Sequence, residues 1–506
     1  MGSAPLSSPL APGQHFTPPA LVDHVLHLAG AAALADGSRV LEPACGEGAF
    51  LLGLARCLRR RLAHMEVLAF EIDPSAAETA RRAFARALEE EAGLGRRAAA
   101  ARARRSVVVG DFLASGIWDE GRFDLAVGNP PFLEAKQMPK AMKAALRREH
   151  ERWTRGAFDL FVPFVGRAAE AVGAEGRLAF VLPNKVCIAR YARSLRDLLL
   201  EAFPLTALTD LSHSRAFEAA SVYPVVVAAA RGETTNRVAI GLGQRQGGTL
   251  HFRRVGSLPR AAFQDAPDRV FFTLPEEETT RADVEALLDP PLRLGELLRI
   301  RWTVSFHRAG LRDRYLFPRR PDSPHALPLL GAGRYQGNRD VERYRIAWRG
   351  WWIDYDQSRA RADGNPLPDP RLFRAPKLVI CQNALRPRAA LDTVGYALKD
   401  TFFAAHPTPA ARRLGVSLEA LLAVLNSDLV HRWYRSVFGM TQVRGGYLHF
   451  LVGYLGHVPL PPPQRLRGPS WRRLVRARSE ASGAPAERLD ARIEAAVREA
   501  FNLPQG

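Results

Sequence analysis

The sequence is poor in cysteine and has no long hydrophobic run. Its 506 residues include four cysteines, at positions 45, 57, 187 and 381, and their spacing matches neither a disulfide framework nor a zinc site. No stretch of about 18 uncharged apolar residues is present, so we expect no membrane-spanning helix. The first 16 residues lack the basic start and apolar core of a secretory signal. We therefore expect a chain that works in the reducing cytoplasm, with neither a membrane anchor nor a metal centre.

Acidic residues are also scarce relative to basic ones. The chain has 71 Lys and Arg against 52 Asp and Glu, a formal net charge of +19. Residues 1–250 carry 31 basic and 26 acidic side chains, whereas residues 251–506 carry 40 and 26. A basic excess concentrated in one half of a chain favours a polyanionic partner, most simply nucleic acid.

The first half of the sequence alternates apolar runs with helical segments. Such alternation predicts a doubly wound, Rossmann-like α/β domain with a mainly parallel sheet, which we place at residues 1–240. Residues 241–506 are rich in Pro and Arg, with short strands and helices near 417–437 and 484–501, and predict a mixed α+β domain. The expected strands are 39–44, 66–72, 105–111, 123–129, 177–183, 205–211 and 221–231, and the expected helices are 48–62, 74–91, 157–173 and 190–202.

Three of these strands are followed by residues that suit a nucleoside carrying an amino acid. In "VLEPACGEGAF", Gly46 allows close approach of a ligand to the backbone, and the acidic Glu42 suits an ammonium group better than a pyrophosphate. The next strand ends at Glu71, where a carboxylate can accept both hydroxyls of a ribose. The third is followed by Asp111 and Phe112, which could accept from an adenine amine and pack on its ring.

Upstream, "FTPPALVDHVL" predicts a helix with Thr17 as its N-cap and Pro18 in its first turn. The positive end of that helix suits a carboxylate. Together these positions predict a binding site for S-adenosylmethionine. Each has a simpler structural explanation when taken alone, and their order along the chain is what favours a ligand.

The segment "FDLAVGNPPF" places an amide, two prolines and an aromatic ring directly after a strand. An exocyclic amine of adenine is a poor nucleophile because its lone pair is delocalised into the ring. The side-chain oxygen of Asn129 and the carbonyl of Pro130 could accept its two hydrogens and free the lone pair for attack on a methyl group. The prolines restrict the backbone and so fix both oxygens, while Phe132 offers a face for stacking.

These motifs resemble, in sequence order, those of the TaqI-like, gamma-class adenine-N6 DNA methyltransferases, which carry a C-terminal target-recognition domain. The resemblance covers "GQHFTPPALVDHVL", "VLEPACGEGAFL", "FEIDP", "GDFL", "FDLAVGNPPF" and "GRLAFVLPNKV". It implies a Rossmann-like catalytic domain that flips an adenine out of double-stranded DNA. By this resemblance, the cofactor would contact Thr17, Glu42, Ala44, Glu71, Asp111 and Pro131, and the target base would contact Asn129, Pro130, Phe132 and Phe217.

The likeness to the TaqI-like specificity domain extends more loosely to the C-terminus. It implies a DNA-reading domain over residues 241–506, in which individual contacts do not transfer. A nuclease, if one accompanies the enzyme in a restriction–modification system, would be a separate polypeptide, and a monomer suffices for the reaction. Candidate phosphate or base contacts are Arg301, Trp302, Arg334, Tyr335, Arg444 and Tyr447.

Other functions use similar motifs. Protein-glutamine N5-methyltransferases share the Asn-Pro-Pro-aromatic motif, although they need no large basic domain. Cytosine-N4 methylation usually has Ser in place of Asn129. A DNA-binding specificity subunit whose catalysis has decayed is a third alternative, against which the intact motif, Glu71 and Asp111 speak.

Overall fold

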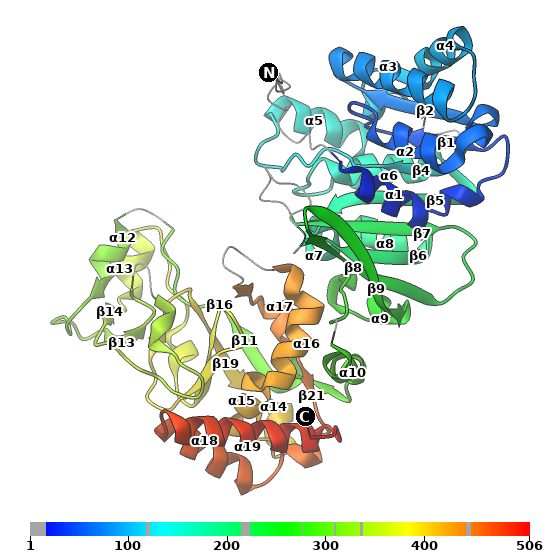
Figure 1. Cartoon of the computed structure of the whole chain (residues 1–506). Coiled ribbons are helices and arrows are strands. Elements are labelled where there is room, and N and C mark those ends of the chain that lie inside the picture. Colours follow the sequence, from blue (N-terminus) through cyan, green and yellow to red (C-terminus); the bar gives the residue numbers. More distant parts are fainter. Residues whose placement is uncertain are drawn as a thin grey trace, which may run out of the picture. The chain divides into compact units, whose positions relative to one another are not determined.

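The computed structural model divides the chain into two compact units, Met1–Leu274 and Pro275–Gly506. It describes residues 17–505 except 118–121, 213, 215–222, 276, 308–309, 334–336 and 442–446. The colours of Figure 1 follow the sequence, so each unit can be traced there. Within the described residues, no helix is both long and apolar enough to cross a membrane.

The first unit is built on a nine-stranded sheet with the order β3-β2-β1-β4-β5-β7-β6-β8-β9. Strands β1 to β5 pair in parallel, and β7 is antiparallel to both β5 and β6. The strands are β1 Arg39–Glu42, β2 Glu66–Glu71, β3 Val107–Val109, β4 Phe123–Gly128, β5 Val172–Pro183, β6 Leu205–Asp210, β7 Pro224–Ala230, β8 Arg237–Gln246 and β9 Thr249–Pro259. The helices are α1 Pro19–Leu28, α2 Ala49–Leu58, α3 Pro74–Glu90, α4 Arg96–Ser106, α5 Lys140–Glu149, α6 Phe161–Ala171, α7 Lys185–Ile188, α8 Arg193–Glu201 and α9 Ala261–Gln264.

All seven predicted strands belong to this sheet, which confirms the predicted Rossmann-like fold. Their sequences are almost continuously apolar because helices cover both faces of a parallel sheet. In β4, for example, every residue except Asp124 is buried. Helix α3 begins as expected, since Asp73 caps it by accepting from the Ser75 N–H at 2.8 Å and Pro74 occupies its first position.

The predicted domain boundary at 240/241 is wrong. It falls inside β8, which pairs with β6 through Ala207↔Ala239 and with β9 through an antiparallel hairpin. The glycines that follow the predicted boundary form the turn of this hairpin, where Gly247 and Gly248 have φ values of +55° and +85°. The strand lacks an apolar run because much of it is exposed. The first unit therefore continues to Leu274.

The second unit contains two four-stranded sheets and two two-stranded ribbons in its described residues. The sheets have the orders β11-β19-β15-β17 and β12-β14-β13-β18, and the ribbons pair β10 with β21 and β16 with β20. Its strands are β10 Leu292–Arg293, β11 Leu298–Arg301, β12 Leu316–Phe317, β13 Ala326–Leu330, β14 Trp352–Asp354, β15 Lys377–Cys381, β16 Asn383–Ala384, β17 Ala389–Asp392, β18 Ala397–Leu398, β19 Phe402–Pro407, β20 Leu448–His449 and β21 Pro459–Leu460.

The helices of this unit complete the predicted mixed α+β fold. They are α10 Glu278–Ala286, α11 Leu294–Leu297, α12 Leu311–Tyr315, α13 Gln357–Ala362, α14 Pro409–Arg413, α15 Leu418–Asn426, α16 Asp428–Phe438, α17 Val452–Leu455, α18 Pro469–Glu480 and α19 Ala484–Ala500. The helix predicted near 484–501 is confirmed. The one predicted near 417–437 is two helices, because Ser427 is extended and its hydroxyl caps α16 by accepting from the Val430 N–H at 3.1 Å.

Close packing of α1 on α2 gives a first prediction. A Cβ added at Gly53 in α2 would lie 2.3 Å from Cγ1 of Val22 and 2.9 Å from Cδ1 of Leu26. Valine in a helix cannot easily rotate away. We expect overpacking in Gly53→Ala to lower the free energy of unfolding by about 1–3 kcal/mol. This loss outweighs the gain of about 1 kcal/mol from the higher helix propensity of alanine.

Calorimetric unfolding should show a Tm for Gly53→Ala that is lower by about 2–4 °C. The control is Gly453→Ala, because Gly453 in α17 is exposed and has no atom within 4 Å of the added Cβ. That variant should unfold at or slightly above the wild-type temperature. Equal Tm values for the two variants would contradict the packing argument.

Candidate functional site

The candidate site lies where the strand order of the first sheet reverses. From β1 the chain proceeds outward to β2 and β3, and then returns to place β4 on the other side of β1. Glu42 ends β1 and Gly128 ends β4, and a Cβ built on Gly128 would lie 3.8 Å from Cγ of Glu42. Ligands of open α/β sheets bind at such a switch point. Glu42 at the end of β1 and the Asn-Pro-Pro-Phe segment after β4 are therefore neighbours.

The glycine turn after β1 is anchored by the end of β2. The Gly46 N–H donates to Oε2 of Glu71 at 2.9 Å, and Oε1 of Glu71 accepts from the Asp73 N–H at 2.9 Å. Gly46 has φ +54°, and no atom lies within 4 Å of a Cβ built there. Each carboxylate oxygen keeps a second lone pair. Glu71 can therefore hold the turn and still accept from a ligand hydroxyl.

Glu42 is a buried carboxyl group with an unused oxygen. It is 1% exposed, and its Oε2 has no hydrogen-bond partner among the described residues. Burial, and then the nearby charge of Glu71, raise the pKa of Glu42 well above its usual value. Burial of the Cys45 thiol, and then the charges of Glu42 and Glu71, raise the pKa of that thiol, so it stays protonated near neutral pH. A cationic ligand group would compensate Glu42.

Thr17 is not the N-cap of α1, contrary to the prediction. Pro18 occupies that position, with φ −60° and ψ 144°, and its carbonyl accepts from the N–H groups of Leu21 and Val22 at 2.9 and 3.1 Å. The Thr17 hydroxyl instead accepts from Nδ2 of Asn129 at 3.1 Å. Oδ1 of Asn129 is buried and has no partner among the described residues. The segment before α1 thus holds the amide of the Asn-Pro-Pro-Phe segment.

The aromatic residues of the predicted site are more buried than expected. Phe132 is 8% exposed and belongs to the hydrophobic core of the first unit. Phe112 is 1% exposed, with its ring centroid 5.6 Å from that of Phe70 and 5.8 Å from that of Phe164. The ring of Phe112 therefore presents no free face for stacking. Asp111 is exposed, and it caps the short helix that follows by accepting from the Leu113 N–H at 2.9 Å.

A polar network beside the Asn-Pro-Pro-Phe segment was missed by sequence reasoning. Nζ of Lys185 lies 2.6 Å from Oε1 of Glu134 and 3.6 Å from Oδ2 of Asp159. Asp159 also accepts from the Tyr191 hydroxyl at 2.5 Å and from the Ala135 N–H at 2.8 Å. The network fixes the loop after Phe132 near the end of β5. Lys185 stands in "VLPNKV", but no spacing in the sequence connects it to the two acidic residues.

Some predicted DNA contacts can be placed in the second unit. Arg301 and Trp302 are exposed at and just after the end of β11, and Tyr447 is exposed beside β20. Arg334, Tyr335 and Arg444, like Phe217 in the first unit, lie outside the described residues. The other predicted residues of the first unit, Ala44, Pro130 and Pro131, lie in the turns after β1 and β4.

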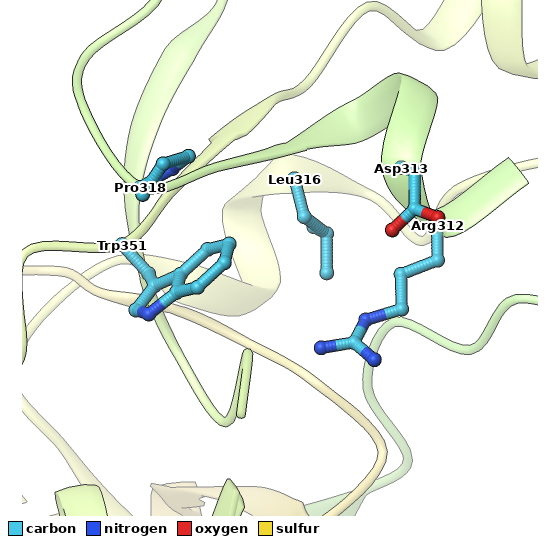
Figure 2. Close-up of a pocket in the computed structure, with 5 residues that line it drawn as sticks. All are labelled: Arg312, Asp313, Leu316, Pro318 and Trp351. Atoms are coloured by element: carbon cyan, nitrogen blue, oxygen red, sulfur yellow. The ribbon is translucent and has the colours of Figure 1, made fainter. Parts of the chain in front are cut away.

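Two open pockets of this unit were not predicted. One, of about 540 Å³, is lined by residues that include Trp302 and Gln382. The other, of about 400 Å³, lies between Trp351, Leu316 and Arg312 (Figure 2). In the part of the chain that the structure describes, no group of three or more His, Cys, Asp or Glu side chains could hold a metal ion.

Two family models match the chain. Residues 67–217 match the Eco57I restriction-modification methylase, and residues 334–460 match the TaqI-like C-terminal specificity domain. Among solved structures, the Type IIL restriction-modification enzyme MmeI in complex with DNA gives a TM-score of 0.56 at 13% identity, over 96% of this chain and 72% of that one. At this identity the likeness concerns the fold alone.

Several curated relatives are Type II methyltransferases. M.PaeR7I of Pseudomonas aeruginosa is 32% identical over 235 residues, and M.XhoI of Xanthomonas vasicola is 30% identical over 220 residues. These matches cover 44% and 40% of this chain but only 40% of each relative's length. M.TthHB8I of Thermus thermophilus is 24% identical over 91% of this chain and 94% of its own length. The two matched domains and these relatives support a TaqI-like restriction–modification methyltransferase, the family that the chain resembles in both of its units.

Proposed function

We propose that the protein transfers a methyl group from S-adenosylmethionine to the N6 amine of a specific adenine in double-stranded DNA. The observation that carries the proposal is the amide of Asn129. Its nitrogen is held by Thr17 at 3.1 Å, and its oxygen is left without a partner at the switch point of the sheet, close to Glu42. A buried acceptor without a donor is costly to a folded protein. An amine donor from a substrate would satisfy it.

The residues around the switch point fit the cofactor. Glu42 has an unpartnered oxygen for its ammonium group, Glu71 has lone pairs for its ribose, and Gly46 leaves open space beside the backbone. Asp111 is exposed for its adenine amine. When bound, S-adenosylmethionine supplies an electrophilic methyl group on sulfur. By family resemblance, Thr17, Ala44 and Pro131 complete the set. Phe112, which its position after the third strand predicted to pack on the adenine ring, is buried against Phe70 and Phe164 instead.

The two oxygens of the catalytic motif activate the target amine. Oδ1 of Asn129 and the carbonyl oxygen of Pro130 accept its two hydrogens, which favours a pyramidal nitrogen whose lone pair points at the methyl carbon. With the cofactor bound, the new nitrogen–carbon bond would form as the carbon–sulfur bond breaks, and the methylated amine would lose one proton to water. Because both acceptors are fixed before the substrate arrives, they need no reorganisation during transfer.

The remaining features of the proposal concern the partner. The target adenine leaves the duplex to reach the switch point. By family resemblance Phe217 stacks on it, whereas Phe132, which is 8% exposed, can offer only the uncovered part of its ring. The first unit carries the chemistry and the basic second unit recognises the DNA site. A monomer is sufficient for the reaction.

Product analysis tests this proposal directly. Purified protein, labelled cofactor and duplex DNA should yield labelled N6-methyladenine, identified by mass spectrometry of the nucleosides. If the label appeared in N4-methylcytosine, or in a glutamine of a protein substrate, that group and not adenine would be the target. Calorimetry that detects no cofactor binding would favour the decayed specificity subunit.

The role of Asn129 gives a second prediction. Asn129→Ala removes one of the two acceptors and should lower kcat by about 10²–10³-fold, the usual loss for one preorganised hydrogen-bonding group. The Kd of the cofactor should change little, because the amide faces the target base. Single-turnover methylation of an adenine-containing duplex measures the first quantity and calorimetry the second. Unaltered turnover would contradict the mechanism.

Two variants of Thr17 serve as a matched pair for this test. Thr17→Val keeps the shape but removes the acceptor that holds Nδ2 of Asn129, so kcat should fall by about 10- to 100-fold through misplacement of the amide. Thr17→Ser keeps the hydroxyl and should retain most of the activity. Equal rates for the two variants would show that the hydroxyl has no positioning role.

Glu42 gives a third prediction, with opposite signs for stability and binding. Its raised pKa means that ionisation above the unfolded-state value of about 4.3 destabilises the unliganded fold. At pH 8, Glu42→Gln should therefore unfold at or above the wild-type Tm, and the difference should vanish below pH 4. Cofactor affinity should fall by about 10-fold or more, because a charge-assisted contact is lost.

Thermal shift assays with and without S-adenosylmethionine measure both effects. The control is Glu66→Gln, since the Glu66 side chain is 60% exposed and pairs with Arg39. This pair lies at the start of β1 and β2, at the opposite end of these strands from Glu42. Glu66→Gln should change neither quantity appreciably. Full cofactor affinity in Glu42→Gln would exclude the proposed ammonium contact.

A further inference from the structure

We propose that one end of the β11-β19-β15-β17 sheet reads base edges of duplex DNA, and that Gln382 determines specificity there by pairing with an adenine. This inference rests on the proposed function and deepens it, because it names the surface of the second unit that selects the site. All of its residues lie within that unit. The surface comprises Trp302, Gln382 and the open end of the β16–β20 ribbon, Leu385 and Tyr447.

Trp302 is the first unusual feature of this surface. It follows β11 directly and is 53% exposed, although its ring packs edge-on against the buried Phe403 with centroids 4.9 Å apart. The indole is thus held in place while one side faces solvent. A fixed, exposed aromatic ring is typical of a contact surface rather than of a core.

Gln382 and Trp302 line the same groove, which has a volume of about 540 Å³. The backbone of Gln382 is fixed on both sides: its N–H donates to the Thr401 carbonyl at 2.9 Å, and its own carbonyl accepts from the Phe450 N–H at 2.8 Å. The side chain therefore projects from a rigid junction of strands. A reader of bases needs such support, since a displacement of an ångström weakens paired hydrogen bonds.

The β16–β20 ribbon continues the surface from Gln382. Asn383 pairs with His449 and Ala384 with Leu448, so Leu385 and Tyr447 come next at the open end of the ribbon. Both are exposed, at 57% and 40%. The major groove of B-DNA admits a two-stranded ribbon, and apolar side chains there can contact thymine methyl groups.

The charges around the groove favour DNA over an acidic or apolar protein surface. Arg299 and Arg301 alternate with buried residues along β11, so both project from its exposed face. The one carboxylate in the groove, Asp400, is compensated by Lys399 at 2.5 Å and by the Ser305 hydroxyl at 2.9 Å. The surroundings are thus basic on balance, as a phosphate backbone requires.

The chemistry of a glutamine amide selects the base. It offers one donor group and one acceptor, and adenine presents an acceptor, N7, beside a donor, the N6 amine, in the major groove. Guanine presents two acceptors at these positions and cytosine presents a donor alone. Gln382 should therefore specify one A·T pair of the recognition sequence, distinct from the methylated adenine, which leaves the duplex.

The test compares the methylated motif of three full-length proteins in a host without other DNA methyltransferases. Wild type, Gln382→Ala and the control Gln464→Ala are expressed, and modified adenines are mapped across the genome. Gln464 is exposed in the same unit, far along the chain from the groove. Gln382→Ala should accept other base pairs at one position of the motif, with kcat/KM on the original site about 10- to 100-fold lower. Gln464→Ala should match wild type.

A binding measurement keeps the inference falsifiable if Gln382→Ala is inactive. The affinity of each protein is measured for the recognition duplex and for duplexes changed at one position, and the variant's cofactor Kd and Tm report its folding. Lost discrimination at a single A·T position supports the inference. Retained discrimination at every position, or an unchanged motif and rate, overturns it. If the genome of the host that expresses wild type contained no modified adenine, the proposed function would be overturned, and this inference with it.

Discussion

The parallel pairing of β1 with both β2 and β4 is the constraint on which the site depends. It brings three strand ends to one edge of the sheet, although Glu42, Glu71 and Asn129 are far apart in the chain. The crossover between β2 and β4 passes through β3 and its helices, so the switch point lies between the ends of β1 and β4. Everything proposed about methyl transfer follows from these three ends sharing one edge.

The same arrangement places the carboxyl groups of Glu42 and Glu71 close enough to interact, and neither forms an ion pair with a described residue. Glu71 is satisfied by backbone donors of its own chain, whereas Glu42 keeps an oxygen without a partner. The fold therefore tolerates an electrostatic cost at Glu42 that a positively charged ligand would remove. In this respect Glu42 resembles Asn129, whose oxygen also lacks a donor. The two unsatisfied acceptors differ in charge, which suits an ammonium group at one and a neutral amine at the other.

The elements that could be predicted from sequence are those with a strong periodic or compositional signal. Buried parallel strands such as β4 are continuous apolar runs, and Asp73-Pro74 marks the start of α3. Strands β8 and β9 lack such runs because their buried residues are interrupted by exposed and half-buried ones, so the sequence predicts a domain boundary inside β8. The order of the site residues along the chain was likewise readable from the motifs.

Contacts between distant segments could not be read in this way. The hydroxyl of Thr17 was assigned to its own helix, yet it bonds Asn129, 112 positions away. The burial of Phe112 and Phe132 also depends on packing, because an aromatic residue looks the same in sequence whether it is exposed or covered. Gln382 gave no signal at all, since its placement depends on the pairing of β15 with β19 and on the ribbon beyond.

The β8–β9 hairpin matters for anyone wishing to exchange recognition modules between relatives of this protein. A chimera joined at residue 240 would cut β8 in two and strip the outer partner from β6, which would then present an unpaired edge prone to aggregation. A junction at Leu274 and Pro275 keeps the whole sheet in one parent. Grafts of new specificity should therefore begin after the hairpin, with the donor sequence entering ahead of α10.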